Sequence, residues 1–253
     1  MTKVDASNLI LKDCFIIHLE RAIQRKPQVQ KLTETLPYKV SVIAAVDGSQ
    51  PSHAMSESYK PNLLRPRYPF SLRQAEIATF LSHRKCWQRI VDEGLKAALV
   101  IEDDVEIIQT EFLAAIEIAM QKIERGDLIR LPVKLREKPQ VIVSSNNHIS
   151  LFKSRAIGLG MVAQIVTYDA AKRLLERTKR FDRPVDTYTQ LTWDHGIRIL
   201  TLWPNGIREI SENLGGSLIG APKTKLNRLR REILRPIYRV KLSISSRIFK
   251  KAV

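Results

Sequence analysis

Short apolar runs alternate along the chain with longer segments of helical spacing. The apolar runs predict buried strands at residues 13–19, 38–46, 97–101, 127–131, 159–165 and 197–202. Helices are expected between them, at residues 21–36, 71–93, 110–125 and 169–178. Residues 50–69 contain four prolines and no clear period, so this segment is expected to be a loop. Alternation of this kind is typical of an α/β fold with a largely parallel central sheet.

Two residues mark the expected ends of the long helix at 71–93, with Ser71 as its N-cap and Gly94 as its stop.

A different pattern begins at Lys223. Apolar residues then recur every three or four positions, at Leu226, Leu229, Ile233, Ile237, Val240, Ile244 and Ile248. Basic residues fill much of the other face, at Lys225, Arg228, Arg230, Arg231, Arg235 and Arg239. Pro236 is expected to break or kink this helix. We therefore divide the chain into a body, residues 1–222, and a basic amphipathic tail, residues 223–253.

The net charge of +16 is concentrated in that tail. Lys223–Val253 carries eleven Lys and Arg residues and one acid, Glu232, and so contributes +10 of the total. A basic amphipathic helix is typical of elements that lie on anionic membranes, where each cation contributes ~1 kcal/mol. The alternative is a helix packed on the body with a solvated basic face. Nucleic acid is not expected, because no helix-turn-helix, zinc-finger or aromatic RNA-binding pattern accompanies the charge.

Other features of the sequence favour a cytoplasmic protein. There is no run of 18 apolar residues, and Met1–Asp5 lacks the layout of a signal peptide. The two cysteines, Cys14 and Cys86, have no metal-ligand spacing and are expected to be buried, reduced thiols. Cys86 acting as a nucleophile near His83 is a less favoured alternative.

Three consecutive carboxylates, Glu102-Asp103-Asp104, directly follow the apolar run 97–101. Like charges this close repel one another, and each loses solvation at the end of a buried strand. A divalent cation, Mg²⁺ or Mn²⁺, would offset both costs, since hard cations take one or two carboxylates together with phosphate oxygens. Ligands of open α/β sheets bind beyond the carboxyl ends of the strands, which is where this cluster is expected. The alternative is an ordinary solvated acidic turn.

Several further blocks follow one another in a fixed order between residues 12 and 220. They are Phe15-Ile16-Ile17-His18-Leu19-Glu20-Arg21 with Arg25, Ala45-Val46-Asp47-Gly48, Ala75-Glu76-Ile77-Ala78 through Leu81-Ser82-His83 to Trp87, Leu99-Val100-Ile101-Glu102-Asp103-Asp104, Gly158-Leu159-Gly160 through Leu174-Leu175, Pro184-Val185-Asp186, and Trp203-Pro204 to Ser217. Their order and spacing resemble glycosyltransferase family 25, the lipooligosaccharide-type glycosyltransferases of Gram-negative bacteria. The chain departs from the family pattern at His18, Ala75, Ala78-Thr79 and Met161-Val162.

The resemblance implies a GT-A-like fold, a Rossmann-related α/β sandwich, and a UDP-sugar donor that carries galactose or glucose. It implies transfer with inversion onto a lipooligosaccharide or lipopolysaccharide glycan. A lipid-linked glycan acceptor would place the enzyme at the cytoplasmic face of the inner membrane, held there by the basic tail. The competing hypothesis is a peripheral membrane adaptor with a degenerate, inactive transferase body. A sugar nucleotidyltransferase is disfavoured, because Leu19-Glu20-Arg21-Ala22 supplies no Gly-rich phosphate loop.

Within this interpretation each candidate residue has a role. Asp104 is the expected metal–diphosphate ligand, Glu102 contacts the ribose, the metal or a metal-bound water, and Asp103 is the weakest of the three. Arg21 and Arg25 are candidates for nucleotide or phosphate contacts, or for a solvated helix face. Ser82 and His83 are candidates for donor contacts on the long helix, where His83 is equally compatible with helix packing.

Inverting transfer also needs a carboxylate base that takes the proton from the acceptor hydroxyl. Asp186, in the Pro184-Val185-Asp186 block, is the first candidate. Asp194, beside Trp193 and His195, is its rival, and Trp193 is a candidate for stacking on a sugar. Glu76 is the third candidate. For each of them the alternative is a surface carboxylate or a helix cap.

Overall fold

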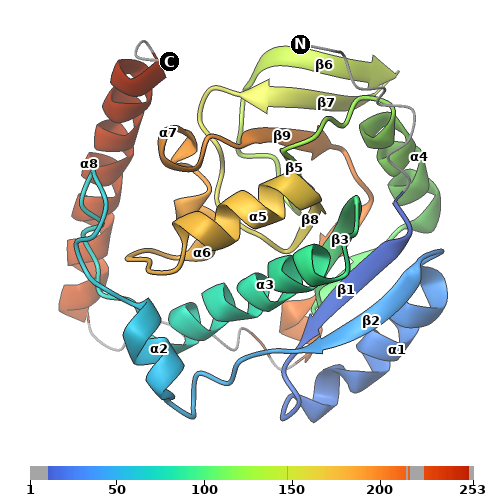
Figure 1. The fold of residues 1–253 in the computed structure, drawn as a ribbon, viewed down its shortest axis with the longest axis horizontal. Helices are drawn as coiled ribbons and strands as arrows, with labels where there is room; N and C mark the ends of the chain where they lie inside the picture. Colours follow the sequence, from blue (N-terminus) through green and yellow to red (C-terminus); the bar gives the residue numbers. More distant parts are fainter. Residues whose placement is uncertain (1–10, 147, 215, 217–224, 251–253) are drawn as a thin grey trace.

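An eight-stranded sheet runs through the middle of the computed structural model, which describes residues 11–146, 148–214, 216 and 225–250 (Figure 1). Its strand order is β2 (Lys39–Ala44), β1 (Asp13–His18), β3 (Ala97–Glu102), β8 (Ala163–Thr167), β5 (Asp127–Arg130), β9 (Arg198–Trp203), β7 (Ile149–Ser154) and β6 (Pro139–Asn146). The pairings β2–β1, β1–β3 and β5–β9 are parallel. A two-stranded antiparallel sheet is formed by β4 (Val105–Ile107) and β10 (Ile207–Glu209).

The expectation of an α/β fold with a mostly parallel sheet is confirmed in strand direction. Six strands run the same way, and only β8 and β7 run against them. The hairpin of β6 and β7 was not predicted. Most side chains of β6 are exposed, so its sequence lacks the apolar run that marks a buried strand.

Helices cover both faces of the sheet and divide its side chains into two cores. On one face lie α1 (Lys26–Thr35) and α4 (Gln109–Met120), which bury Leu32 and Phe112. On the other lie α3 (Gln74–Asp92) and α5 (Tyr168–Arg177), with the shorter α2 (His53–Ser58), α6 (Val185–Tyr188) and α7 (Thr192–His195). The strands feed both cores alternately, as in β3, where Leu99 faces the first and Val100 the second.

Helix boundaries differ from the sequence expectation in several places, among them the helix expected at 110–125, which ends at Met120. The segment 21–36 contains a 3₁₀ turn, Ile23–Arg25, before α1. The long helix begins at Gln74, with Arg73 rather than Ser71 at its N-cap, because the Glu76 carboxylate accepts a hydrogen bond from the Arg73 backbone N–H at 2.8 Å. The helix stops at Gly94 as expected, where φ is +62°. The segment 50–69, expected to be a loop, contains α2. A second 3₁₀ turn spans Ser211–Leu214.

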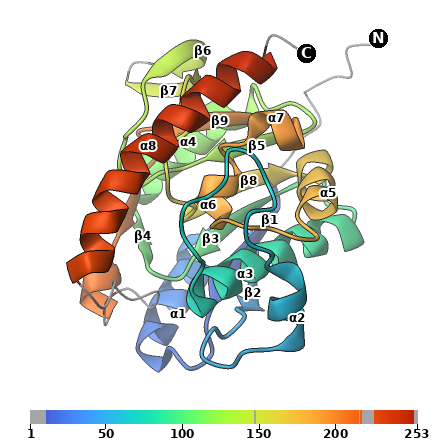
Figure 2. The same cartoon turned by 90° about the vertical axis from the view of Figure 1, so that its left-hand side faces the viewer.

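The basic tail forms one long helix, α8 (Lys225–Lys250), that lies across the outside of the layered body (Figure 2). Of the break or kink expected at Pro236, the break is not found, because the helix continues through the proline. The two buried residues after the proline, Tyr238 and Leu242, join the core that contains α3 and α5, and this burial offsets the lost backbone hydrogen bond. Arg183 donates a hydrogen bond to the Tyr238 hydroxyl at 2.6 Å.

The face of α8 turned away from the body is apolar. Ile233, Ile237, Val240, Ile244 and Ile248 are between 45% and 60% exposed. We call these five residues the exposed stripe. Residues 223–224 and 251–253 lie outside the described part of the chain, as do Met1–Asp5 and the side chains of 225–231. Within the described part, no helix combines the length and apolarity needed to span a bilayer.

Candidate functional site

A cavity of about 410 Å³ opens beyond the carboxyl ends of β1, β2 and β3, and we call it the strand-end cavity. The chain leaves the parallel strands there through Leu19, Ala45 and Glu102, which all line it. One face of α3 forms the opposite wall, through Ala75, Ala78, Thr79, Ser82 and His83. The place expected from the Glu102-Asp103-Asp104 cluster is therefore occupied by a cavity, in accord with the general rule for open α/β sheets.

Asp103 connects the acidic cluster to β1 and to the turn that follows it. It is buried, its Oδ1 accepts a hydrogen bond from Arg25 Nη1 at 2.6 Å, and its Oδ2 lies 2.6 Å from His18 Nδ1. Both oxygens are thus engaged by β1 and by the turn that follows it. Arg25, also buried, reaches Gly216 O at 3.0 Å as well. His18, one of the positions that depart from the family pattern, therefore has a structural role as a partner of Asp103.

Asp104 also lines the cavity, but its carboxylate is less completely paired. Its Oδ2 lies 3.2 Å from Arg25 Nη1, and its Oδ1 has no hydrogen-bond partner among the described residues. Burial and the neighbouring charge of Glu102 raise the pKa of Asp104 to about 6, and the charges of Asp103 and Glu209 act in the same direction. Excess negative charge is therefore concentrated at Asp104.

Glu102 is oriented by a helix. Its Oε1 lies 3.3 Å from His83 Nε2, and the His83 Nδ1 lies 3.0 Å from the Gln164 side-chain nitrogen on β8. With the Gln164 amide donating to Nδ1, the Nε2 carries the proton and donates to Glu102. His83 is almost fully buried, so it acts on the cavity by positioning Glu102.

The carboxylates fit a hard cation that is shared with a ligand. No group of three or more His, Cys, Asp or Glu side chains forms a complete metal site within the described residues. Mg²⁺, however, takes only one or two carboxylates when substrate phosphates complete its shell. Asp104 Oδ1 has no hydrogen-bond partner among the described residues, and Arg25 does not fully offset the neighbouring carboxylates, since the pKa of Asp104 stays raised. Asp104 and Glu102 are therefore the residues that would hold such an ion.

The turn after β2 closes the cavity on its other side. Ser82 accepts a hydrogen bond from the Val46 backbone N–H at 2.9 Å, which fixes the turn to α3. Gly48 approaches α3 so closely that a Cβ there would lie 2.7 Å from Ala75 Cα, so only glycine fits. Arg21 donates to Asp47 at 2.8 Å and leaves much of its side chain exposed at the cavity.

A second cavity, of about 450 Å³, adjoins the first, and we call it the Asp186 cavity. The two cavities share Thr79, Glu102 and Val162 as lining residues. Asp186 and Glu76 both line the second one, so two of the three candidate bases lie on the far side of Glu102 from the strand-end cavity. Asp186 Oδ2 accepts a hydrogen bond from the Gly160 N–H at 3.0 Å, and its Oδ1 accepts one from Thr187 at 3.2 Å.

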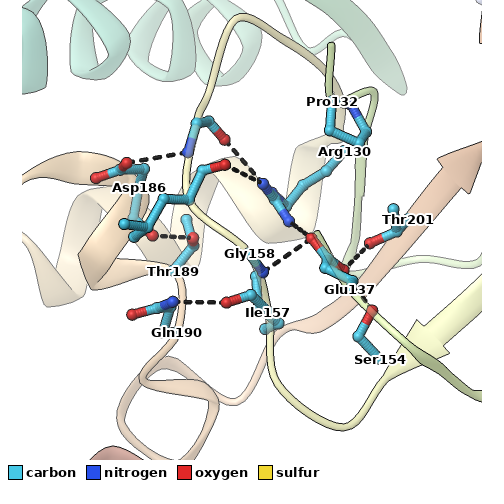
Figure 3. Close-up of polar contacts among 12 residues, drawn as sticks. Arg130, Pro132, Glu137, Ser154, Ile157, Gly158, Asp186, Thr189, Gln190 and Thr201 are labelled. Atoms are coloured by element: carbon cyan, nitrogen blue, oxygen red, sulfur yellow. Dashed lines mark hydrogen bonds and ion pairs between the residues drawn. The ribbon is translucent and has the colours of Figure 1, made fainter. Parts of the chain in front are cut away.

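The loop that carries Gly160 is fixed by a buried ion pair, Arg130–Glu137 (Figure 3). Arg130 Nη2 donates to Gly160 O at 2.9 Å, and Glu137 accepts from the Gly158 N–H at 2.8 Å and from Thr201 at 2.6 Å. Burial opposes ionisation of Glu137, but Arg130 and these donors outweigh it and lower its pKa. No pattern in the sequence marks this pair, since its members are joined only by the tertiary fold.

Asp194 lies apart from the other candidates. It accepts a hydrogen bond from the Tyr188 hydroxyl at 2.7 Å and lines neither cavity. Trp193 stacks on Phe249 of α8, with ring centroids 6.0 Å apart. Glu209 and Ser211, which were not predicted as site residues, also line the strand-end cavity. β10 brings them there by pairing with β4, and their position in the closing block of the family resemblance was the only signal for them.

Comparisons with known proteins identify the family to which the chain is similar. The family described as glycosyltransferase family 25 (LPS biosynthesis protein) matches residues 11–189. A glycosyltransferase 25 family member of Anopheles gambiae is 28% identical over 200 residues, covering 76% of this chain and 33% of that protein. Procollagen galactosyltransferase 1 of Danio rerio is 29% identical over 120 residues, covering 46% of this chain and 20% of that protein.

Other relatives are named as inactive. The probable inactive glycosyltransferase 25 family member 3 of Bos taurus is 27% identical over 201 residues, covering 74% of this chain and 33% of that protein. The chain thus spans about a third or less of the length of these relatives. Mannose-1-phosphate geranyltransferase from Thermus thermophilus superposes with a TM-score of 0.33 and 7% identity over 76% of this chain and 73% of that one, too loosely to bear on the function. Because the family match covers most of its length, this chain belongs to glycosyltransferase family 25.

Proposed function

We propose that this protein transfers a hexose, galactose or glucose, from a UDP-sugar to a lipooligosaccharide or lipopolysaccharide glycan, with inversion at the anomeric carbon. One observation carries the proposal. Two cavities meet at Glu102, one with cations and unpaired carboxylate charge, the other with two candidate bases. A donor in the first cavity would present its anomeric carbon to an acceptor in the second.

In this proposal the strand-end cavity holds the donor. Arg21 is half exposed at the cavity, so its guanidinium could contact the diphosphate while Nε stays bonded to Asp47. Arg25 is paired with Asp103 and Asp104 and fixes their orientation. Asp104 and Glu102 would hold Mg²⁺ or Mn²⁺ together with the diphosphate. When bound, such an ion neutralises the charge that develops on the leaving UDP. Glu102 also lies at the entrance to the second cavity, where the sugar would be.

Asp186 is the base that we favour. Two hydrogen bonds hold its carboxylate in place at the edge of the second cavity, and each oxygen keeps a further lone pair. Those lone pairs are where the carboxylate would take the proton from the acceptor hydroxyl. Glu76 is tied to the start of α3 by the Arg73 backbone N–H and is the second candidate.

Association with the cytoplasmic face of the inner membrane is part of the proposal. The exposed stripe gives α8 an apolar face of isoleucine and valine on an otherwise basic helix. Such a helix binds anionic lipid by shallow insertion together with charge attraction. It would hold the cavities near a lipid-linked glycan acceptor.

Thermal unfolding in the presence of a panel of UDP-sugars, with and without Mn²⁺, tests the donor assignment. A ligand that binds only the folded state adds ~2.7 kcal/mol of apparent stability at a hundred times its Kd. UDP-galactose or UDP-glucose should raise the unfolding temperature, and Mn²⁺ should increase the shift. Absence of a shift with every UDP-sugar would contradict the proposal.

An inactive membrane adaptor is the second candidate function, because several members of the family are named as inactive. It predicts membrane binding through α8 with no donor binding. Against it, the strand-end cavity is formed and Asp104 and Glu102 both line it. The same unfolding panel separates the two hypotheses.

A further inference from the structure

A third cavity, of about 940 Å³, adjoins the Asp186 cavity, and we call it the basic cavity. It lies between the loop after β7, the short helix α7 and the second half of α8. It shares Arg136, Leu159, Gln190 and Arg239 with the Asp186 cavity, so the two are continuous. A chain of sugars that places one end beside Asp186 would therefore extend into this space.

The basic cavity is lined by seven cationic side chains: Arg136, Lys138, Lys153, Arg155, Arg198, Arg239 and Arg247. Arg198 is paired with Asp127 and Glu124. The side chains of the other six form no ion pair or hydrogen bond with the described part of the chain. Six like charges around one space repel each other, and a polyanionic ligand would relieve that repulsion.

The single carboxylate in the lining does not neutralise this charge. Glu137 is buried and already accepts from Arg130, Ser154, Thr201 and the Gly158 N–H. Arg130 therefore neutralises its negative charge through the ion pair drawn in Figure 3. The charged groups that face the cavity without a partner are therefore all cationic.

The cavity wall also offers an aromatic surface. Trp193 lines it, half-buried, and is held by stacking on Phe249. An aromatic face beside separated cations suits a ligand with both sugar rings and anionic groups, since rings pack on the indole and anions pair with Lys and Arg. An anionic membrane surface, by contrast, would interact with the cations and not with the indole.

We propose that the basic cavity binds phosphate groups carried by the acceptor glycan, next to the sugar that is extended. This inference rests on the proposed transferase function, because it takes the Asp186 cavity as the place of transfer. It names the class of acceptor: a phosphorylated oligosaccharide in preference to a neutral one. The same phosphate chemistry occurs in lipid headgroups, so the test must separate the two sources.

The test measures binding by calorimetry with glucose 1,6-bisphosphate as the probe and glucose as its uncharged counterpart. Saturating UDP is present throughout, so that the strand-end cavity is not the site observed. Wild type should bind the bisphosphate and not glucose, and its affinity should fall as salt is added. The variant Lys138→Gln/Lys153→Gln/Arg155→Gln should lose about ten-fold in affinity or more, since three charges leave one site.

The matched control is Lys39→Gln/Lys179→Gln/Arg180→Gln, which removes three exposed cations that line none of the cavities described. It should bind the probe as wild type does. Equal affinity of the two triple variants, or no binding of the probe by wild type, would overturn the inference. Separate titrations of UDP into each protein show whether the donor site is intact, so its loss would be seen apart from loss of the phosphate site.

A second arm uses vesicles of phosphatidylcholine with and without phosphatidylglycerol. If the cavity variant binds both kinds of vesicle as wild type does, the cations serve the glycan, as proposed. If it loses binding to the anionic vesicles while its affinity for the sugar bisphosphate is unchanged, the cations contact lipid headgroups and the inference fails.

Discussion

Arg25 and Asp103 form a buried ion pair, with 2.6 Å between Nη1 and Oδ1. Because of this contact, the three carboxylates of the Glu102-Asp103-Asp104 cluster have different roles. Asp103 is neutralised within the protein. Asp104 and Glu102 line the strand-end cavity, where their negative charges are less fully compensated, as the raised pKa of Asp104 indicates. The carboxylate that looked weakest as a ligand is thus the one that holds the site in shape.

Replacing Arg25 with Ala should destabilise the protein by about 3–5 kcal/mol, because removal of one partner leaves an unpaired buried charge. The matched control is Arg21→Ala. Its ion pair with Asp47 is largely exposed, so that variant should lose no more than about 1 kcal/mol. Urea unfolding measures both. Equal losses in the free energy of unfolding would show that the buried Arg25–Asp103 pair stabilises the protein no more than the Arg21–Asp47 pair does.

The stability of the protein without ligand should depend on Asp104. Its folded pKa, about 6, lies above its ordinary value of 3.8, so the folded state binds more protons between these two values. Stability should then fall as the pH rises from about 4 to 6, by roughly 1–3 kcal/mol. Asp104→Asn should flatten this part of the curve. Urea unfolding from pH 4 to pH 7 would detect it, and an unchanged slope in the variant would count against the assigned cause.

Asp186→Asn should abolish transfer while leaving donor affinity intact. The asparagine oxygen can still accept from the Gly160 N–H, so the loop keeps its place, but the base is gone. Loss of a general base costs typically ~10²–10⁴ in rate. Steady-state kinetics with the donor from the UDP-sugar panel, combined with UDP titrations, measure both quantities.

Glu76→Gln and Asp194→Asn complete that comparison. Asp194→Asn should stay close to wild type, because Asp194 contacts Tyr188 away from both cavities. If Glu76→Gln loses activity and Asp186→Asn does not, Glu76 is the base and our preference is wrong.

Membrane binding should depend on the exposed stripe. Deleting α8 would also remove Tyr238 and Leu242 from the core, so substitution is the cleaner change. Ile233→Ser/Ile237→Ser/Ile244→Ser should weaken binding to anionic vesicles strongly, since each buried side chain contributes roughly 1.5–3 kcal/mol. The control Val42→Thr/Val141→Thr/Ile142→Thr alters exposed apolar residues of the sheet. Flotation assays that give the same result for both variants would exclude the stripe as the contact.

Much of the fold could be read from local patterns. The apolar runs at 13–19 and 97–101 mark strands that are buried on both faces, and Gly94 ends α3 as its position indicated. The direction of β8 could not be read, because an apolar run looks the same whichever way it is inserted between β3 and β5. The exposed β6 lacks a buried-strand pattern altogether.

The site shows the same limit. The Glu102-Asp103-Asp104 cluster was visible as consecutive charges after a strand. Their different partners were not, since His18 and Arg25 reach Asp103 from 85 and 78 residues away. Glu209 enters only because β10 pairs with β4, and the Arg130–Glu137 pair is recognisable only once the loop after β7 is placed. Long-range pairing therefore decides which of the charged residues share a cavity.

The central claim is that the strand-end cavity binds a nucleoside diphosphate through Asp104. Calorimetric titration of UDP in the presence of Mn²⁺, with wild type and Asp104→Asn side by side, tests it most directly. We expect wild type to bind UDP with an affinity that depends on Mn²⁺. We expect Asp104→Asn to lose about ten-fold or more of that affinity, since one charged ligand leaves the site. Equal UDP affinity in the two proteins would contradict the account.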